Sequence, residues 1–137
     1  MLQHTTFQGF RINEANIKLN DLKDKETFKI SPRFECKMTG NDKGFSSFLS
    51  VRIDNTIIGE RTPFDLKVEI VGSFLLGEDL VYSKQEQLRY ALNTLFPYLR
   101  SFVTNLTSSC GIPAFNLPYI DVDTMVANLR SDNQEIN

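Results

Sequence analysis

Apolar and polar residues alternate in three segments of the N-terminal half of the chain. Between residues 28 and 38 every second position is apolar or proline, and the same alternation returns over residues 49–53 and 64–70. A hydrophobic period of two is typical of a strand that turns one face to a core. Residues 12–19 alternate more weakly about Lys18, and they predict a fourth strand.

Turn-forming residues between these segments indicate how the strands pair. The run Asn-Asp-Lys-Gly at residues 41–44 separates the first two segments, and it predicts a hairpin. Pro32 cannot donate a hydrogen bond to a ladder, so we expect an edge strand, a bulge or an irregular start there, with a more regular strand after Arg33. Because the connections are too short for crossover helices, we expect antiparallel pairing throughout.

The hydrophobic period changes to that of a helix from residue 88 onward. Apolar side chains at steps of four and three draw one stripe, formed by Leu88, Leu92, Leu95, Leu99, Phe102 and Leu106. Ser83 and Glu86 resemble a capping box and Gly111 a helix stop, which places a long helix over about residues 83–110. Pro97 removes a backbone hydrogen bond in the middle, so we expect a kinked or split helix.

The same helix carries a second apolar line of Phe96, Val103 and Cys110. Two apolar lines indicate that the helix is buried on more than one side, either by a second layer of the same chain or by another subunit. We predict that one line meets the sheet of its own subunit and that the other meets a partner helix. The candidate interface residues on the two lines are Leu92, Phe96, Leu99, Val103, Leu106 and Cys110.

The segment after this helix is unusually apolar for a connection. Residues 111–120 carry aromatic and aliphatic side chains around two prolines, so this loop is either covered by its own domain or binds something apolar. Asp121 is a candidate cap for a short helix over about residues 121–130, striped by Val122, Met125, Val126 and Leu129. Residues 131–137 form a polar tail.

Together these elements predict an α+β fold. A single domain over residues 1–137 is expected to hold a four-stranded antiparallel sheet, within about residues 12–76, packed by a long kinked helix and a short second helix. The 137 residues are 41% hydrophobic and 23% charged, which is ordinary for one globular domain with its own core.

Charge and termini exclude further classes of protein. The chain has 15 Lys and Arg against 17 Asp and Glu, and this net charge of -2 provides no basis for binding nucleic acid. Its apolar runs are far shorter than the roughly 20 residues that a membrane helix needs. The N-terminus lacks the charged start and apolar centre of a secretory signal, so we expect a cytoplasmic protein without stable membrane insertion.

Residues that carry chemistry are sparse. His4 is the one histidine, and Cys36 and Cys110 lie far apart without a CxxC spacing. Glycine-rich phosphate loops are absent from the sequence. We therefore predict no catalytic residues, no metal and no cofactor, and we interpret the two cysteines as buried apolar side chains.

The C-terminal half resembles a known family. The run Leu95-Phe96-Pro97-Tyr98 with Arg100, the residues 111–113, and the run Phe-Asn-Leu-Pro-Tyr-Ile-Asp-Val-Asp at 115–123 resemble the SecB export chaperones. That family has a similar FPY-x-R run in its long helix and a similar NL-x-P run in the following loop. The order of strands and helices is also similar. The motif resemblance covers roughly residues 92–129, and over the N-terminal half it is confined to the strand order and residues 64–74.

The resemblance implies a holdase without catalytic residues. Two subunits would join their sheets, and two such dimers would pack through the long helices, giving a homotetramer. Unfolded or export-bound clients would lie in apolar grooves. By position, the candidate groove residues are Phe74, Leu76, Ile112, Phe115, Leu117, Tyr119, Met125 and Leu129. Each of these side chains is equally consistent with a place in the core.

The resemblance further implies a docking face for the motor ATPase SecA, made of acidic side chains on the outside of the sheet. Here Lys67 stands near one expected acid, and a shifted patch of Glu14, Asp65 and Glu69 is either such a face or an ordinary solvated strand surface. SecB-like relatives also serve as dedicated chaperones of antitoxins. The alternatives are therefore a dedicated chaperone for one partner, such as an antitoxin, or a domain that binds an apolar small ligand.

Overall fold

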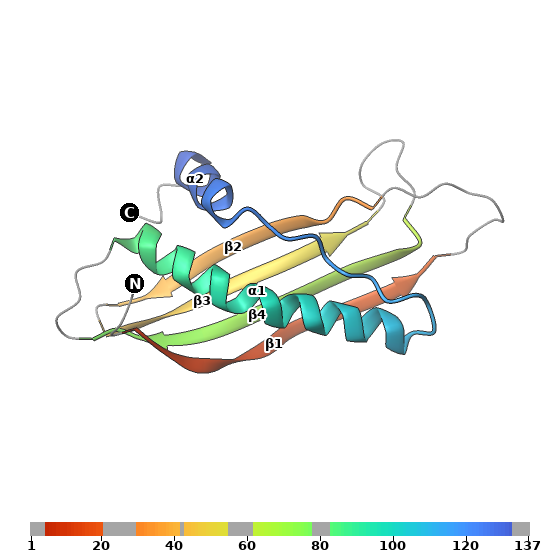
Figure 1. Ribbon diagram of the computed structural model, residues 1–137, viewed down its shortest axis with the longest axis horizontal. Coiled ribbons are helices and arrows are strands. Elements are labelled where there is room, and N and C mark those ends of the chain that lie inside the picture. Colours follow the sequence, from red (N-terminus) through yellow and green to blue (C-terminus); the bar gives the residue numbers. More distant parts are fainter. Residues whose placement is uncertain (1–4, 21–29, 42, 55–61, 78–82, 133–137) are drawn as a thin grey trace.

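The computed structural model describes residues 5–20, 30–41, 43–54, 62–77 and 83–132, with side chains of the last helix described as far as residue 127. The elements are β1 (Thr6–Leu19), β2 (Arg33–Gly40), β3 (Gly44–Ile53), β4 (Phe64–Leu75), α1 (Lys84–Ser109) and α2 (Val122–Asp132). The strands form one antiparallel sheet in the order β1-β4-β3-β2. Both helices lie on one face of it, here called the inner face, and no described helix covers the opposite, outer face (Figure 1). The predicted fold class is confirmed.

The predicted hairpin joins β2 to β3. Asn41 closes the turn, because its side-chain oxygen accepts hydrogen bonds from the backbone N–H groups of Lys43 at 2.9 Å and Gly44 at 3.2 Å. β2 begins at Arg33, directly after Pro32, as the missing proline donor predicts. Residues 28 and 29 of the predicted strand lie outside the described residues, and Ile30 precedes β2.

The first strand is longer than the sequence predicts. β1 has 14 residues and pairs with β4 from Thr6 opposite Leu75 to Leu19 opposite Phe64. Its register shifts twice, between Phe7 and Gly9 and again after Ile12, and each shift breaks the alternation of apolar and polar positions. The expectation that this strand spans only residues 12–19 is therefore wrong, because bulges hide its N-terminal part from a period-two pattern.

The core lies between the inner face and α1. Apolar residues at every second position are buried there, namely Phe45, Leu49, Val51 and Ile53 of β3 and Phe64, Leu66, Val68, Ile70 and Phe74 of β4. Fully burying such a side chain is worth roughly 1.5–3 kcal/mol, so this layer provides most of the stabilisation. At Gly72 a Cβ would lie 2.6 Å from a methyl group of Leu95, so any larger residue there would require the Leu95 side chain to shift.

The helix ends match the predicted caps. The Ser83 hydroxyl accepts a hydrogen bond from the backbone N–H of Glu86 at 3.1 Å, and Gly111 follows α1 with a φ of 81°. Asp121 caps α2 by accepting from the backbone N–H of Thr124 at 3.1 Å. Hydrogen bonds from Thr124 hold the pKa of the Asp121 carboxyl below its usual value of 3.8.

Pro97 does not divide the long helix. α1 continues through it as one helix of 26 residues, so the alternative of a split helix is wrong. The ring removes the donor that would bond the carbonyl of Asn93, and both residues lie on the exposed side of α1. Water can bond that carbonyl, so the helix continues at little cost.

Candidate functional site

The segment between the two helices, residues 111–121 and here called the connector, runs back along α1 on the side of β3 and β2 (Figure 1). It contains no helix or strand, so its backbone polar groups need other partners. The Arg100 side chain donates from Nε to the carbonyl of Leu117 at 2.9 Å. The buried Thr107 hydroxyl accepts from the backbone N–H of Phe115 at 2.8 Å and donates to the carbonyl of Val103 at 2.9 Å.

Two further contacts hold the connector and α2 to α1. The Thr104 hydroxyl lies 2.9 Å from the side-chain oxygen of Asn116, and Arg89 forms an ion pair with Asp123 at 2.6 Å. These polar anchors were not predicted from the sequence. Their one signal was spacing, since Arg100, Thr104 and Thr107 recur on one helical face beside the FPY-x-R run.

The connector side chains divide by exposure. Leu117 is fully buried, whereas Phe115 is half-buried and its ring meets Phe64 edge-on at 5.9 Å. Tyr119 is 80% exposed, and its ring lies 4.9 Å from the guanidinium carbon of Arg100. The Arg100 guanidinium contacts one side of the Tyr119 ring, and the rest of the ring is exposed to solvent. An apolar ligand can cover this exposed aromatic surface.

The residues predicted for the groove fall into three groups. Phe74 and Leu117 are core residues with at most 2% exposed surface, and the Phe74 ring stacks on Phe45 at 4.9 Å. Tyr119 is exposed, and the half-buried members are Leu76, Ile112, Phe115 and Met125. Leu129 belongs to α2, but its side chain lies outside the described residues. For Phe74 and Leu117 the structure therefore supports the core position, which the sequence left open beside the groove, because their own domain covers them almost completely.

The inner side of β2 adds apolar surface that the sequence analysis did not assign to the site. Phe34, Cys36 and Met38 alternate on this side and are half-buried against the core. β2 is an edge of the sheet, so in the described part of the chain its outer backbone edge has no strand partner. Burial raises the pKa of the Cys36 thiol to about 11, so the thiol stays neutral.

Both apolar lines of α1 are largely buried within one chain. Leu92, Leu99 and Val103 have no exposed surface, and Phe96 has 5%. The Phe96 ring meets Phe34 of β2 at 6.1 Å and Tyr119 of the connector at 6.0 Å. For Phe96 and Val103 the expected partner helix is therefore replaced by the chain's own sheet and connector. Leu106 and Cys110 are half-buried, and their place in an interface stays a prediction.

A cluster of exposed aromatic rings lies where α1 faces β1. Phe10 and Tyr98 are each 43% exposed, their ring centroids lie 4.4 Å apart, and Phe7 lies 6.0 Å from Tyr98. β1 is the other edge of the sheet and has no partner on its outer side in the described part of the chain. An unpaired strand beside an exposed aromatic cluster is a candidate surface for joining a second sheet.

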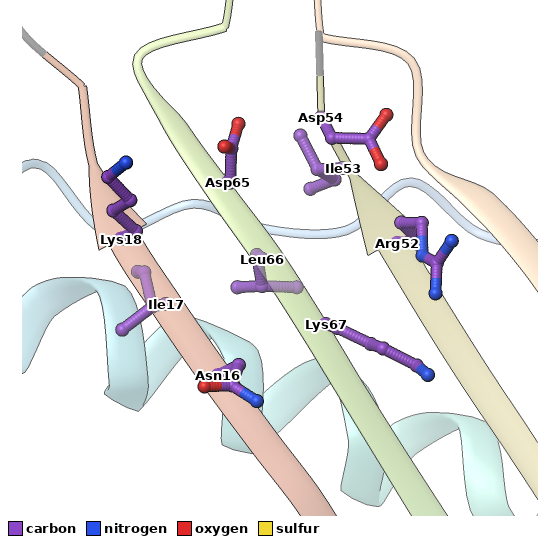
Figure 2. A pocket seen from close by; sticks show the side chains of 9 residues that line it. All are labelled: Asn16, Ile17, Lys18, Arg52, Ile53, Asp54, Asp65, Leu66 and Lys67. Carbon is purple, nitrogen blue, oxygen red and sulfur yellow. The ribbon is translucent and has the colours of Figure 1, made fainter. Parts of the chain in front are cut away.

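The three acids predicted for motor docking lie on the outer face, on β1 and β4. Glu14 stands opposite Glu69 in the register, and Lys67 forms an ion pair with Glu14 at 3.3 Å. Asp65 accepts a hydrogen bond from Asn20 at 3.2 Å. Figure 2 shows Lys67 beyond Asp65 along β4, at a hollow of about 290 Å³. The face is therefore mixed in charge rather than acidic, and its role in docking stays a prediction.

Sequence comparisons find relatives but no matching family model. An uncharacterized protein of Methanocaldococcus jannaschii is 24% identical over 136 residues, which cover 94% of this chain and 86% of that protein. The protein-export protein SecB of Anaplasma phagocytophilum is 30% identical over 93 residues, 64% of this chain and 57% of that SecB. Similarity to a SecB is therefore found by sequence comparison as well, over about two thirds of this chain.

Two solved structures share the fold. The SecB-like chaperone Rv1957 of Mycobacterium tuberculosis, in complex with a ChAD peptide from the HigA1 antitoxin, superposes with a TM-score of 0.67 at 17% identity, over 85% of this chain and 91% of that one. A protein of unknown function from Streptococcus agalactiae gives a TM-score of 0.52 at 12% identity, over 84% and 97%. The chain thus has the SecB-like fold. No helix within the described residues is long and apolar enough to cross a membrane.

Proposed function

We propose that this protein is a SecB-like chaperone that holds extended apolar segments of a client polypeptide. The observation that carries the proposal is the anchored connector, which exposes Tyr119 and half-exposes Phe115. The SecB-like fold and the 93-residue similarity to a SecB support the same function. A catalytic step forms no part of the proposal, and cytoplasmic location stays a prediction.

In this proposal the client lies beside β2 and under the connector. An extended segment can add to the free edge of β2 through backbone hydrogen bonds, which do not depend on its sequence. Its apolar side chains would cover Tyr119, Met125 and the half-buried side chains of β2, including Met38. Affinity would come from this burial, less the cost of ordering the client.

The outer face favours a dedicated client over delivery to SecA. Lys67 forms an ion pair with Glu14, and Lys18 and Arg52 line the hollow of the outer face together with Lys67. A motor surface complementary to an acidic face would be repelled by these cations. The Mycobacterium tuberculosis neighbour was solved with an antitoxin peptide. An antitoxin-like segment is therefore the client class that we favour, with general export as the second candidate.

A holdase assay with a slowly folding client tests this function, because binding delays the client's refolding or aggregation. Tyr119→Ser should weaken client binding while the melting temperature stays within about 1 °C, since the side chain is 80% exposed. Leu75→Ser is the matched control, because Leu75 is 50% exposed on the outer face, away from the connector. A Tyr119→Ser variant that melts early, or that binds clients as tightly as the wild type, would exclude the connector as the binding surface.

Adding purified SecA to the same assay separates the two client classes. Release of the client that requires the motor ATPase would support export. Binding of an antitoxin segment without any effect of SecA would support the dedicated role.

A further inference from the structure

Charged side chains on the outer face form rows that cross the strands. Arg33 of β2 stands opposite Arg52 of β3, and Arg52 stands opposite Lys67 of β4. These three residues, here called the cationic row, therefore lie side by side on three neighbouring strands. With strands about 4.8 Å apart, the row extends over roughly 10 Å.

Such a row is unfavourable for the fold itself, because like charges directly opposite each other in a sheet repel. The two outer members have acidic neighbours, since Arg33 pairs with Asp54 and Lys67 pairs with Glu14. Arg52 in the middle forms no ion pair with any described residue. The row thus keeps a cation that an external anion can neutralise.

The surface around the row is hollowed on both sides. Arg52 and Lys67 line the hollow of about 290 Å³ together with Asn16 and Lys18. They also line a second hollow of about 120 Å³, which includes Arg33. Figure 2 shows Lys67 on β4 and Arg52 on the neighbouring strand β3. Carboxylate groups can therefore reach both cations from the outer face.

We propose that the cationic row is a docking site for an acidic polypeptide segment. Arginine binds a carboxylate through two parallel hydrogen bonds, and Arg52 forms no ion pair within the described part of the chain that would occupy its donors. The exposed ion pairs of Arg33 and Lys67 are weak, so their exchange for a ligand carboxylate costs little. The site is on the opposite face of the sheet from the connector, so it does not depend on the proposed client surface.

Acidic rows on either side distinguish a peptide from a nucleic acid. Asp54 and Asp65 lie two residues along the strands in one direction, and Glu35 and Glu69 lie two residues along in the other. Two residues of strand span about 7 Å, so a continuous polyanion would lie against these carboxylates. A peptide that places an acidic side chain on the row and uncharged residues beside it avoids that repulsion.

Fluorescence anisotropy at low ionic strength tests the proposal with a labelled glycine-rich peptide that carries one central pair of glutamates. Wild-type protein should bind this peptide, and salt should weaken the binding. Arg52→Gln should reduce affinity about fivefold, the effect of one ion pair of about 1 kcal/mol. Arg11→Gln is the matched control, because it removes the same charge from the same face outside the row, and it should change affinity less than about twofold.

Stability provides an independent readout. Because Arg52 opposes two cations, Arg52→Gln should melt at the same temperature as the wild type or higher. Equal losses of affinity in Arg52→Gln and Arg11→Gln, or no binding of the acidic peptide, would overturn the proposal.

Stronger binding of a lysine–glycine peptide or of a single-stranded oligonucleotide would also overturn it. The lysine–glycine result would instead favour the acidic docking face predicted from the sequence. Tyr119→Ser should leave acidic-peptide binding unchanged, so failure at the cationic row and failure at the connector can be told apart.

Discussion

The two faces of the sheet differ in what their side chains do: the inner face is buried and apolar, whereas the outer face is polar and charged. On the inner face of β3, Leu49, Val51 and Ile53 have no exposed surface, whereas Ser50 and Arg52 between them carry polar groups to the outer face. Inner residues contribute stability through burial of apolar surface. Outer ion pairs contribute little each, so their pattern can change without loss of the fold. Substitutions on the outer face can therefore change the choice of partner without loss of the fold, whereas the residues of the inner face determine folding.

Replacing Val103 with Asp should give the largest effect, because it places a charge at a position without exposed surface beneath the sheet. We expect a loss of about 4 kcal/mol or more in the free energy of unfolding, or no folded protein. Circular dichroism melts measure this. Ser101→Asp on the exposed side of α1 is the control, and it should change stability by less than about 0.5 kcal/mol. Similar melts for the two variants would contradict the burial of Val103.

Thr107→Val should give the next largest effect, because it removes the hydroxyl that bonds the backbone N–H of Phe115. An unsatisfied buried donor costs about 1–3 kcal/mol, and we expect the melting temperature to fall by about 4 °C per kcal/mol. Thr94→Val removes only a bond to the carbonyl of Tyr90 within α1, so it should be nearly neutral. If both variants melt alike, the connector is not held by this hydrogen bond.

Self-association should depend on the aromatic cluster at the edge where the two faces meet. We expect a dimer or a tetramer by light scattering at micromolar concentration, because β1 offers an unpaired edge beside Phe10 and Tyr98. Phe10→Lys should shift the protein toward smaller species with a small change in melting temperature, since Phe10 is 43% exposed. A wild-type monomer would refute this prediction.

Titration of Cys36 should produce the smallest effect. Burial raises its pKa from 9.0 to about 11 in the folded state, so the folded protein favours the neutral thiol. Its contribution to stability is complete below pH 9.0 and is lost as the pH rises toward about 11. Melts across this range should therefore show a steeper alkaline decline for wild type than for Cys36→Ala. Parallel declines would show that the thiol is solvated.

The sequence by itself determined the local elements and the fold class. Period-two runs predict three strands, Asn41 and Gly44 predict the hairpin, and Ser83 and Gly111 predict the ends of α1. These features depend on neighbours a few residues apart, so a linear pattern contains them. The same holds for the FPY-x-R run at residues 96–100 and the Asn-Leu-Pro run at residues 116–118, which indicated the SecB resemblance.

Only the tertiary structure decided which apolar side chains are covered and by what. Phe96 and Tyr119 carry similar rings, yet Phe96 is buried and Tyr119 is 80% exposed. In the sequence, Arg52 is an ordinary polar position of a strand. Only the strand register places it between Arg33 and Lys67. Strand order, register and the path of the connector join residues far apart in the chain, and a period along the sequence cannot encode those contacts.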